Sequence, residues 1–408
     1  MENTTSKKRQ VLHAVLLTAP CVVAYLVVYL ARNILSALTP GMLETGNYTM
    51  EYISTISTAN MLCYAVGQLV NGIIGNKIKG SFMVGMGLLC GGLCSIGFAF
   101  SDSLWLSAML YGACGFFWSM LYAPMVRLIS ESVSPLYAPR CTIFLTIASF
   151  LGSPLAGVMA LLFQWNVAFM ISGGLQIAIG TGTLLMLLVL EKKGILVSTR
   201  RVAERAGEGG FRVLLKRRIL RFSLVAIITG IVKNTVVFWI PTYFNQYLGF
   251  SEELAVTVYS VVTLMMAVAP ALNLSIYEKL MRRNIHRSIT AMFAVGALAF
   301  CMMALIKNPI ANVPFLVLAL IANGGAATML WNVYCPSLRD TGVVSGATGY
   351  LDFVSYMASA GANIFFPKMV GWIGWGGLIA VWCGFLVVGG AAYLPLIWKK
   401  KAVDQAEN

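Results

Sequence analysis

The sequence predicts an all-α membrane protein with twelve transmembrane helices in two six-helix bundles related by a pseudo-two-fold axis. The 408 residues are 59% hydrophobic and only 11% charged, whereas soluble domains carry about 25% charged residues. Twelve apolar segments approach the roughly 20 residues that cross a bilayer, and two patterns recur in the second half. Helices are favoured over a closed barrel, because the period-two alternation of barrel strands is absent.

The twelve spans follow one another with short polar breaks, and each boundary is defined only to within several residues. They cover residues 11–38, 50–75, 81–100, 103–129, 140–163, 166–190, 218–247, 252–278, 287–305, 312–336, 343–367 and 373–398. The break after the sixth span is long, rich in charge and glycine, and poor in large apolar residues, which is typical of a linker. We therefore predict an N-terminal bundle over 1–190, a cytoplasmic linker over 191–217 and a C-terminal bundle over 218–408.

The charged residues divide between two alternating sets of loops. Basic residues gather at Lys7–Arg9, from Lys192 to Arg221 and at Lys399–Lys401, whereas the other loops hold acidic residues such as Glu44 and Glu51. Because basic loops remain cytoplasmic, we expect both termini inside the cell and a multi-pass protein of the inner (plasma) membrane. The formal charge of +14 then reflects contact with the lipid bilayer. We expect no nucleic acid partner, and a monomer.

Two patterns repeat in the same order in both halves of the chain. A basic residue followed by Asn precedes a proline by eight residues, and a Tyr-x-Pro-x-x-Arg motif ends a later span. The copies are Arg32-Asn33 with Pro40 and Lys233-Asn234 with Pro241, 201 residues apart, then Tyr122 to Arg127 and Tyr334 to Arg339, 212 residues apart. Duplicated halves with a substrate site between them are typical of secondary transporters. A channel would instead show rings of like polar side chains.

Three ionisable residues lie inside the predicted spans: Arg32, Lys233 and Asp352. Charges at such positions are costly and are functional hypotheses by default. A two-fold relation would bring Arg32 and Lys233 to opposite sides of one cavity, which favours a small anionic substrate. The alternative is that each cation is neutralised by a protein carboxylate, for which only Asp352 is available. Asp352 itself has three possible roles: an ion pair with either cation, proton carriage, or a hydrogen bond to a neighbouring helix.

Polar and aromatic residues at helical spacing surround Arg32. Tyr25, Tyr29, Arg32 and Ser36 stand at i, i+4, i+7 and i+11, which places them on one helix face. Tyr64 and Gln68 form a second polar pair at i, i+4. We expect both groups to line the substrate site. For four further residues near the same depth we favour a packing role: Trp118, Tyr122, Asn332 and Tyr334.

Catalytic chemistry finds no support in the sequence. His13 and His286 stand near the ends of separate spans and cannot form a metal cluster. A Walker-type Gly-x-x-x-x-Gly-Lys-Ser/Thr loop is missing, so this chain is not expected to hydrolyse ATP. The nine cysteines lie in or beside apolar spans and are interpreted as packing residues. We expect no enzyme activity, no metal and no cofactor.

The motifs around the two cations resemble a known transporter family. The segment Tyr25-x-x-x-Tyr29-Leu-Ala-Arg32-Asn33, with Lys233 and Pro241-Thr242-Tyr243, resembles the organophosphate:phosphate antiporter family of the major facilitator superfamily. The resemblance implies the major facilitator fold, with phosphate bound by the residues at Arg32 and Lys233. It also implies that Tyr25, Tyr29 and Tyr64 line the site.

A second resemblance concerns the loop between the second and third spans. The segment Gly72-Ile-Ile-Gly75-Asn76-Lys77 resembles the superfamily motif that latches the inner gate, with Asn76 and Lys77 in place of its usual Asp and Arg. We therefore assign gating to Gly72, Asn76 and Lys77.

These features lead to one functional expectation and two alternatives. The expectation is exchange of an organophosphate for inorganic phosphate by alternating access. Several positions depart from the antiporter pattern: Lys233 replaces an arginine, Gln68 replaces a lysine, Ser149 replaces a histidine, and Asp352 has no counterpart. A proton-coupled symporter of a carboxylate such as a sugar acid therefore remains open. A membrane sensor of an anionic metabolite, with the transporter fold but no flux, is the alternative of another class.

Overall fold

The structure is a computed structural model that describes the chain except residues 1, 75–77, 102, 135–136, 197–214, 307, 339–343 and 395–408. All regular elements within the described residues are helical. In chain order they are α1 (Glu2–Glu44), α2 (Met50–Ile74), α3 (Gly80–Ala99), α4 (Leu104–Trp118), α5 (Tyr122–Ser132), α6 (Ala138–Leu162), α7 (Trp165–Lys192), α9 (Ile219–Gly230), η1 (Ile231–Val236), α10 (Val237–Gln246), α11 (Glu252–Met266), α12 (Ala269–Lys279), α13 (Ile285–Leu305), α14 (Pro309–Thr328), η2 (Met329–Tyr334), α15 (Cys335–Ser337) and α16 (Val344–Ala391).

The expected helical membrane fold is confirmed. Ten described helical segments are long and apolar enough to cross a membrane. The last of them, within α16, contains a non-helical residue, Gly374, with φ 67° and ψ 177°, which divides it into two helices. The 25-residue helix α2 is not among the ten. Counting α16 as two helices and including α2, the described helices correspond to the twelve expected spans, of which residues 75, 343 and 395–398 lie outside the described residues.

Several helices differ in detail from the predicted spans. The first span was predicted over 11–38, but α1 extends from Glu2 to Glu44 and includes Pro20 and Pro40. The fourth span is broken between α4 and α5, and the eighth between α11 and α12. The seventh and tenth contain π-helical turns, η1 and η2. Hydropathy reports the length of an apolar segment but not its backbone hydrogen-bond pattern, so these breaks could not be read from it.

The helices divide into two compact units. The first consists of Met1–Glu204 with Val256–Leu264, and the second of Arg205–Ala255 with Met265–Asn408. Residues 197–214 of the predicted linker lie outside the described part of the chain. The domain boundaries at 190 and 218 therefore stay a prediction.

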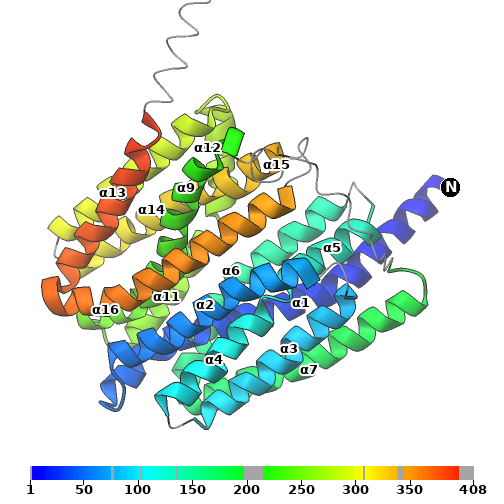
Figure 1. The fold of residues 1–408 in the computed structure, drawn as a ribbon, viewed down its shortest axis with the longest axis horizontal. Helices are drawn as coiled ribbons and strands as arrows, with labels where there is room; N and C mark the ends of the chain where they lie inside the picture. Colours follow the sequence, from blue (N-terminus) through cyan, green and yellow to red (C-terminus); the bar gives the residue numbers. More distant parts are fainter. Residues whose placement is uncertain are drawn as a thin grey trace, which may run out of the picture. The chain divides into compact units, whose positions relative to one another are not determined.

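Within the first unit, three helix pairs pack closely: α3 with α7, α1 with α6, and α2 with α4 (Figure 1). Glycines permit these approaches. A Cβ at Gly173 of α7 would meet the backbone oxygen of Gly92 in α3, and one at Gly152 of α6 would lie 2.8 Å from the backbone nitrogen of Leu30 in α1. The close approach of α6 holds the segment of α1 that carries Arg32.

Buried polar side chains also join helices of the first unit. Trp118 Nε1 donates to Gln176 Oε1 over 2.7 Å, and Gln176 Nε2 donates to Ser95 Oγ over 3.1 Å. The structure therefore gives Trp118 the packing role that the sequence favoured. Asn71 Nδ2 donates to the Ser119 hydroxyl over 2.7 Å, which ties α2 to the break between α4 and α5.

Within the second unit, the path α9–η1–α10 follows α16, and α13 packs between α14 and α16. The first of these packings has a defined register. Ser223 Oγ lies 3.5 Å from Tyr350 Oη, Asn234 Nδ2 lies 3.1 Å from Ser359 Oγ, and further along Trp239 pairs with Asn363. Residue numbers rise together along both helices, so α9–η1–α10 runs parallel to the part of α16 before Gly374.

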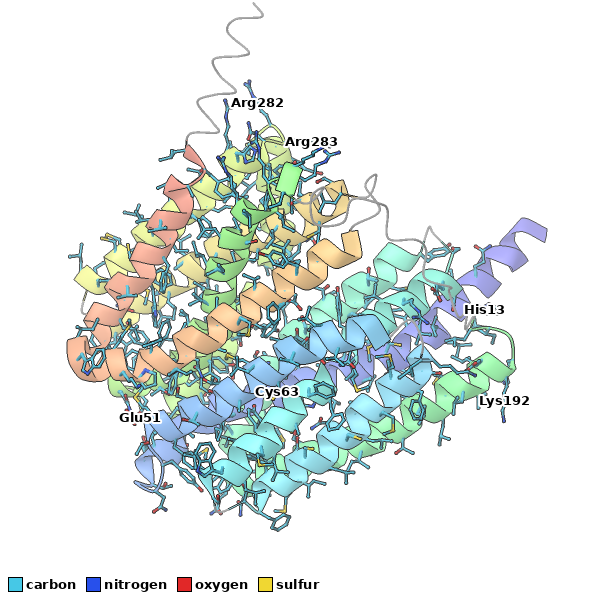
Figure 2. The ribbon with its side chains drawn as sticks, in the orientation of Figure 1. His13, Glu51, Cys63, Lys192, Arg282 and Arg283 are labelled. Atoms are coloured by element: carbon cyan, nitrogen blue, oxygen red, sulfur yellow. The ribbon has the colours of Figure 1, made fainter. Side chains whose placement is uncertain are left out.

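Charged side chains mark the two ends of the first unit. His13 and Lys192 lie at one end of its helices and Glu51 lies at the other (Figure 2). At the first of these ends, Lys79 Nζ and Glu191 Oε1 form a 2.7 Å ion pair between the start of α3 and the end of α7. The segregation agrees with the alternating loops of the sequence, and the cytoplasmic assignment of the basic end stays a prediction.

Candidate functional site

The Arg32 guanidinium lies against two aromatic rings in the first unit. Its Cζ atom is 5.1 Å from the ring centroid of Tyr29, on α1, and 4.4 Å from that of Tyr64, on α2. A guanidinium within about 6 Å of a ring face is attracted by the negative potential of the ring. Two aromatic rings thus contribute to stabilising a charge inside an apolar span.

Hydroxyl and amide groups extend this cluster. Gln68 Nε2 donates to Tyr64 Oη over 2.9 Å, and Tyr25 Oη donates to Tyr29 Oη over 3.4 Å. The Tyr25 and Tyr29 rings meet edge to face with centroids 4.9 Å apart. Tyr25 and Tyr64 are 7% and 5% exposed, respectively. The structure therefore brings together Arg32 and the four lining residues that the sequence proposed in this half.

The helical spacing of the sequence explains this meeting. Residues four apart on α1 and on α2 lie on one face of each helix. Ser36, the last residue of the predicted stripe, is 1% exposed and so is more buried than Arg32, which is half-buried.

Sequence reasoning missed Tyr122 as a member of the cluster. Its ring stacks on Tyr25 with centroids 5.6 Å apart, and the residue is 42% exposed. The sequence favours a packing role for Tyr122, whereas its exposed face and its contact with Tyr25 place it in the candidate site. The available signal was its position in the repeated Tyr-x-Pro-x-x-Arg motif. The structure adds the reason for its orientation, since α5 begins at Tyr122 directly after the break that follows α4.

Two further polar groups fix the backbone around Arg32. Tyr111 Oη, from α4, lies 3.4 Å from the backbone oxygen of Arg32. Asn33 Nδ2 donates to the backbone oxygen of Tyr29 over 2.7 Å. Neither residue was assigned a role from the sequence. Both act on main-chain atoms, a role that residue type and spacing alone do not indicate.

Lys233 lies in the second unit on the π-helical turn η1. The backbone N–H of Val237 bonds to the oxygen of Val232, five residues earlier, which defines the turn. Lys233 is exposed, whereas its neighbours Val232 and Thr235 are fully buried. The sequence predicted an uninterrupted helix here. The role of Lys233 as the second cation of the site stays a prediction.

Asp352 lies on α16, N-terminal to Ser359. Asn234, next to Lys233, bonds to Ser359, and Asp352 precedes Ser359 by seven residues. At 1.5 Å per residue, this separates Asp352 from the turn of Lys233 by about 10 Å along the axis. Asp352 is half-buried. Its three possible roles remain open.

The predicted gating residues lie at the edge of the described chain. Gly72 belongs to α2, while Asn76 and Lys77 lie outside the described residues. Among the residues that the structure places, there is no group of three or more His, Cys, Asp or Glu side chains arranged to hold a metal ion. All nine cysteines are free thiols.

Known solved structures share this fold. A bacterial homolog to the human lysosomal transporter Spinster, in an inward-facing and unoccupied conformation, superposes with a TM-score of 0.74 at 11% identity, covering 93% of this chain and 96% of that one. A D-xylose-proton symporter gives a TM-score of 0.69 at 13% identity, with coverages of 93% and 96%. Structural similarity at identities this low shows a common fold but does not indicate which substrate this chain binds.

Two curated relatives match part of the chain. They are the membrane sensor proteins UhpC of Salmonella typhimurium (strain LT2) and of Escherichia coli (strain K12), 28% and 27% identical over 160 residues. The aligned part is 38% of this chain and spans only 36% of the length of each relative.

A match over most of the chain assigns the family. The sequence profile of the Major Facilitator Superfamily matches residues 21–362, which include both Arg32-Asn33 and Lys233-Asn234. This match indicates a membrane transporter and not an enzyme. The protein belongs to the major facilitator superfamily.

Proposed function

We propose that this protein is a secondary active transporter that moves a small organic anion by alternating access, with Arg32 and Lys233 binding the anionic group. The observation that carries the proposal is the placement of the Arg32 guanidinium against the rings of Tyr29 and Tyr64. The N–H groups of arginine bind carboxylate and phosphate in a bidentate manner. The positive charge of this guanidinium attracts an anionic group.

The composition of the cluster favours an organophosphate exchanged for inorganic phosphate. Phosphate offers several acceptor oxygens, and Tyr29, Tyr64 and Gln68 offer neutral donors beside the cation. The tyrosine rings supply apolar contact area for the organic part of the substrate. Lys233 contributes a compact charge with three donors, which suits a tetrahedral oxyanion without requiring a planar geometry.

The test is transport by the purified full chain in proteoliposomes. Uptake of labelled glycerol-3-phosphate, a hexose phosphate and a hexuronate is measured with and without internal phosphate, and with and without a pH gradient. We expect phosphate ester uptake that requires internal phosphate. Hexuronate uptake that depends on the pH gradient and not on internal phosphate would contradict phosphate exchange and support proton symport.

The matched variants are Arg32→Lys, Arg32→Ala and Lys192→Gln. Arg32→Lys keeps the charge and loses the planar fork, so we expect anion binding to weaken by about 1.5–3 kcal/mol, or about 10- to 150-fold. Arg32→Ala should abolish exchange. Lys192→Gln removes a positive charge at the exposed end of α7 in the same unit and should leave exchange unchanged. Wild-type exchange by Arg32→Ala would refute the proposed site.

A sensor of an anionic metabolite is the second candidate function. The observation that favours it is the similarity to two proteins named as membrane sensors over 160 residues. A sensor would bind the anion, as measured by ligand-dependent thermal stabilisation, but would show no counterflow in proteoliposomes. Counterflow by the purified chain rules this candidate out.

A further inference from the structure

The turn that carries Lys233 is π-helical, whereas the helices on either side of it are α-helical. The segment η1 covers six residues between α9 and α10. π-Helical turns are rare, and they occur mostly as single insertions inside α-helices, frequently at functional sites. A change of one residue in helical register turns a side chain by about 100° around the axis. The form of this turn therefore sets the direction of Lys233.

Three side-chain hydrogen bonds connect this region to α16. Thr235 Oγ1 donates to the backbone oxygen of Ser359 over 2.9 Å, and Asn234 Nδ2 donates to Ser359 Oγ over 3.1 Å. One turn later, Trp239 Nε1 donates to Asn363 Oδ1 over 2.9 Å. Thr235, Ser359, Trp239 and Asn363 are all 0% exposed. Breaking a hydrogen bond between buried polar groups costs free energy, because water cannot replace the lost partner. These bonds therefore define one register between the two helices.

The residues before η1 are held from two sides. A Cβ at Gly230, the last residue of α9, would overlap the Ser355 side chain and lie 3.0 Å from the Ser355 backbone oxygen. Glycine at this position allows the helix backbone to touch α16 directly. On another side, Asn323 Nδ2 of α14 donates to the backbone oxygen of Thr229 over 3.4 Å. The start of the turn is thus fixed as well as its end.

The corresponding basic residue and Asn in the first half of the chain have a different backbone form and different hydrogen-bond partners. Arg32-Asn33 lies within the continuous helix α1, and Asn33 bonds to a backbone oxygen of its own helix. Arg32 is oriented by two aromatic rings. In the second half, Asn234 bonds to α16. A lysine ammonium has no plane for rings to orient, so its direction depends more heavily on the backbone that carries it.

We propose that Thr235, Asn234 and Ser359 form a clamp that keeps η1 in its π-helical form and thereby aims Lys233 at the bound anion. The three are positioning residues, since they act through Lys233. This inference rests on the proposed anion site for the role of Lys233, but the clamp itself can be tested without substrate. Loss of the clamp releases the turn to other registers and rotates residue 233 away from its present exposure.

The first test measures the direction of residue 233 directly. Lys233→Cys is introduced into a chain whose nine cysteines are replaced by serine or alanine, and labelling by a water-soluble thiol reagent is timed. Thr235→Val removes the clamping hydroxyl and keeps the shape, while Thr235→Ser keeps the hydroxyl. We expect Thr235→Val to slow labelling by about fivefold, as for the loss of one hydrogen bond, and Thr235→Ser to label at the parental rate.

A second variant, Ser359→Ala, tests the clamp in case Thr235→Val does not fold. Ser359→Ala removes the acceptor of Asn234 and leaves the backbone oxygen that Thr235 uses, so it should fold and slow labelling by a smaller factor. Equal labelling rates in the parent, Thr235→Val and Ser359→Ala would overturn the clamp. The same slowing in Thr235→Ser as in Thr235→Val would also overturn it, because the effect would not depend on the hydroxyl.

The second test is made in the chain that retains Lys233. Thr235→Val should raise the KM for counterflow by about fivefold with a nearly unchanged maximal rate, and Thr235→Ser should restore the KM. Failure of the proposed function leaves a different signature. In that case the wild-type chain binds no anion, while the labelling rate of the cysteine at 233 still depends on Thr235.

Discussion

At the scale of single residues, the candidate site combines a permanent charge with neutral aromatic neighbours. Arg32 is half-buried and lies within 4.4 Å of the Tyr64 ring centroid. A charged group in a membrane span usually pairs with an opposite charge or faces water. Ring faces supply part of the stabilisation here, and hydroxyl groups attached to the same rings remain in the cluster. Tyr64 thus makes two separable contacts, one with Arg32 through its ring and one with Gln68 through its hydroxyl.

A pair of substitutions at Tyr64 separates these contacts. Tyr64→Phe keeps the ring face and loses the bond from Gln68, while Tyr64→Leu loses both. We expect Tyr64→Leu to weaken anion binding by about 1–2 kcal/mol, or about five- to thirtyfold, and Tyr64→Phe to have the smaller effect. The Kd for the anion, measured by ligand-dependent thermal stabilisation, distinguishes them. Equal losses in both variants would show that the hydroxyl, and not the ring, is the important group.

At the scale of helices, close packing through glycine holds the site in place. Gly152 of α6 leaves room for the backbone of α1 at Tyr29 and Leu30, three and two residues before Arg32. The two helices form one of the main packing pairs of the first unit. A side chain at this position would push α1 away from α6 and displace Tyr29.

Gly152→Ala tests this packing, with Gly174→Ala as the matched control. The added methyl group at position 152 meets backbone atoms, so we expect a loss of about 1–3 kcal/mol in the free energy of unfolding and a lower Tm. A Cβ at Gly174, in α7 of the same unit, meets no atom within 4 Å. Thermal unfolding in detergent should show no loss for Gly174→Ala. A similar Tm for both variants would contradict the role of this contact.

At the scale of the whole molecule, the proposed transport cycle moves an anion in each direction and needs no separate proton. Asp352 is the one carboxylate inside a predicted span, and it lies about two turns from Lys233 along the helix axis. Along the axis, the backbone of Asp352 is thus separate from the turn that carries Lys233. Its contribution to coupling can therefore be tested separately from anion binding.

Asp352→Asn removes the titratable group and keeps its size. We expect Asp352→Asn to exchange phosphate for an organophosphate. As in the wild type, the rate of exchange should not depend on an imposed pH gradient. Glu253→Gln, which changes an exposed carboxylate at the start of α11, is the control. Uptake that follows a pH gradient in the wild type and in the control, and fails in Asp352→Asn, would instead identify proton symport through Asp352.

Much of the fold and half of the candidate site could be predicted because they depend on local patterns. Apolar length determines which segments span a bilayer, and the twelve predicted spans correspond to described helices. Helical spacing placed Tyr25, Tyr29 and Arg32 on one face, and the structure shows these side chains in contact. The repeat of Arg32-Asn33 at Lys233-Asn234 identified the second cation as a candidate, and that assignment remains a proposal.

The sequence by itself determined the helical membrane class and the number of spans, and it identified Arg32 and Lys233 as candidate site residues, whose role stays a proposal. The tertiary structure alone decided that Tyr122 stacks on Tyr25, that Tyr111 reaches the backbone of Arg32, and that the turn of Lys233 is π-helical. The physical reason is that hydrophobic length and helical periodicity are properties of neighbouring residues. Ring stacking and helical register depend instead on partners such as Ser359, more than a hundred residues away along the chain.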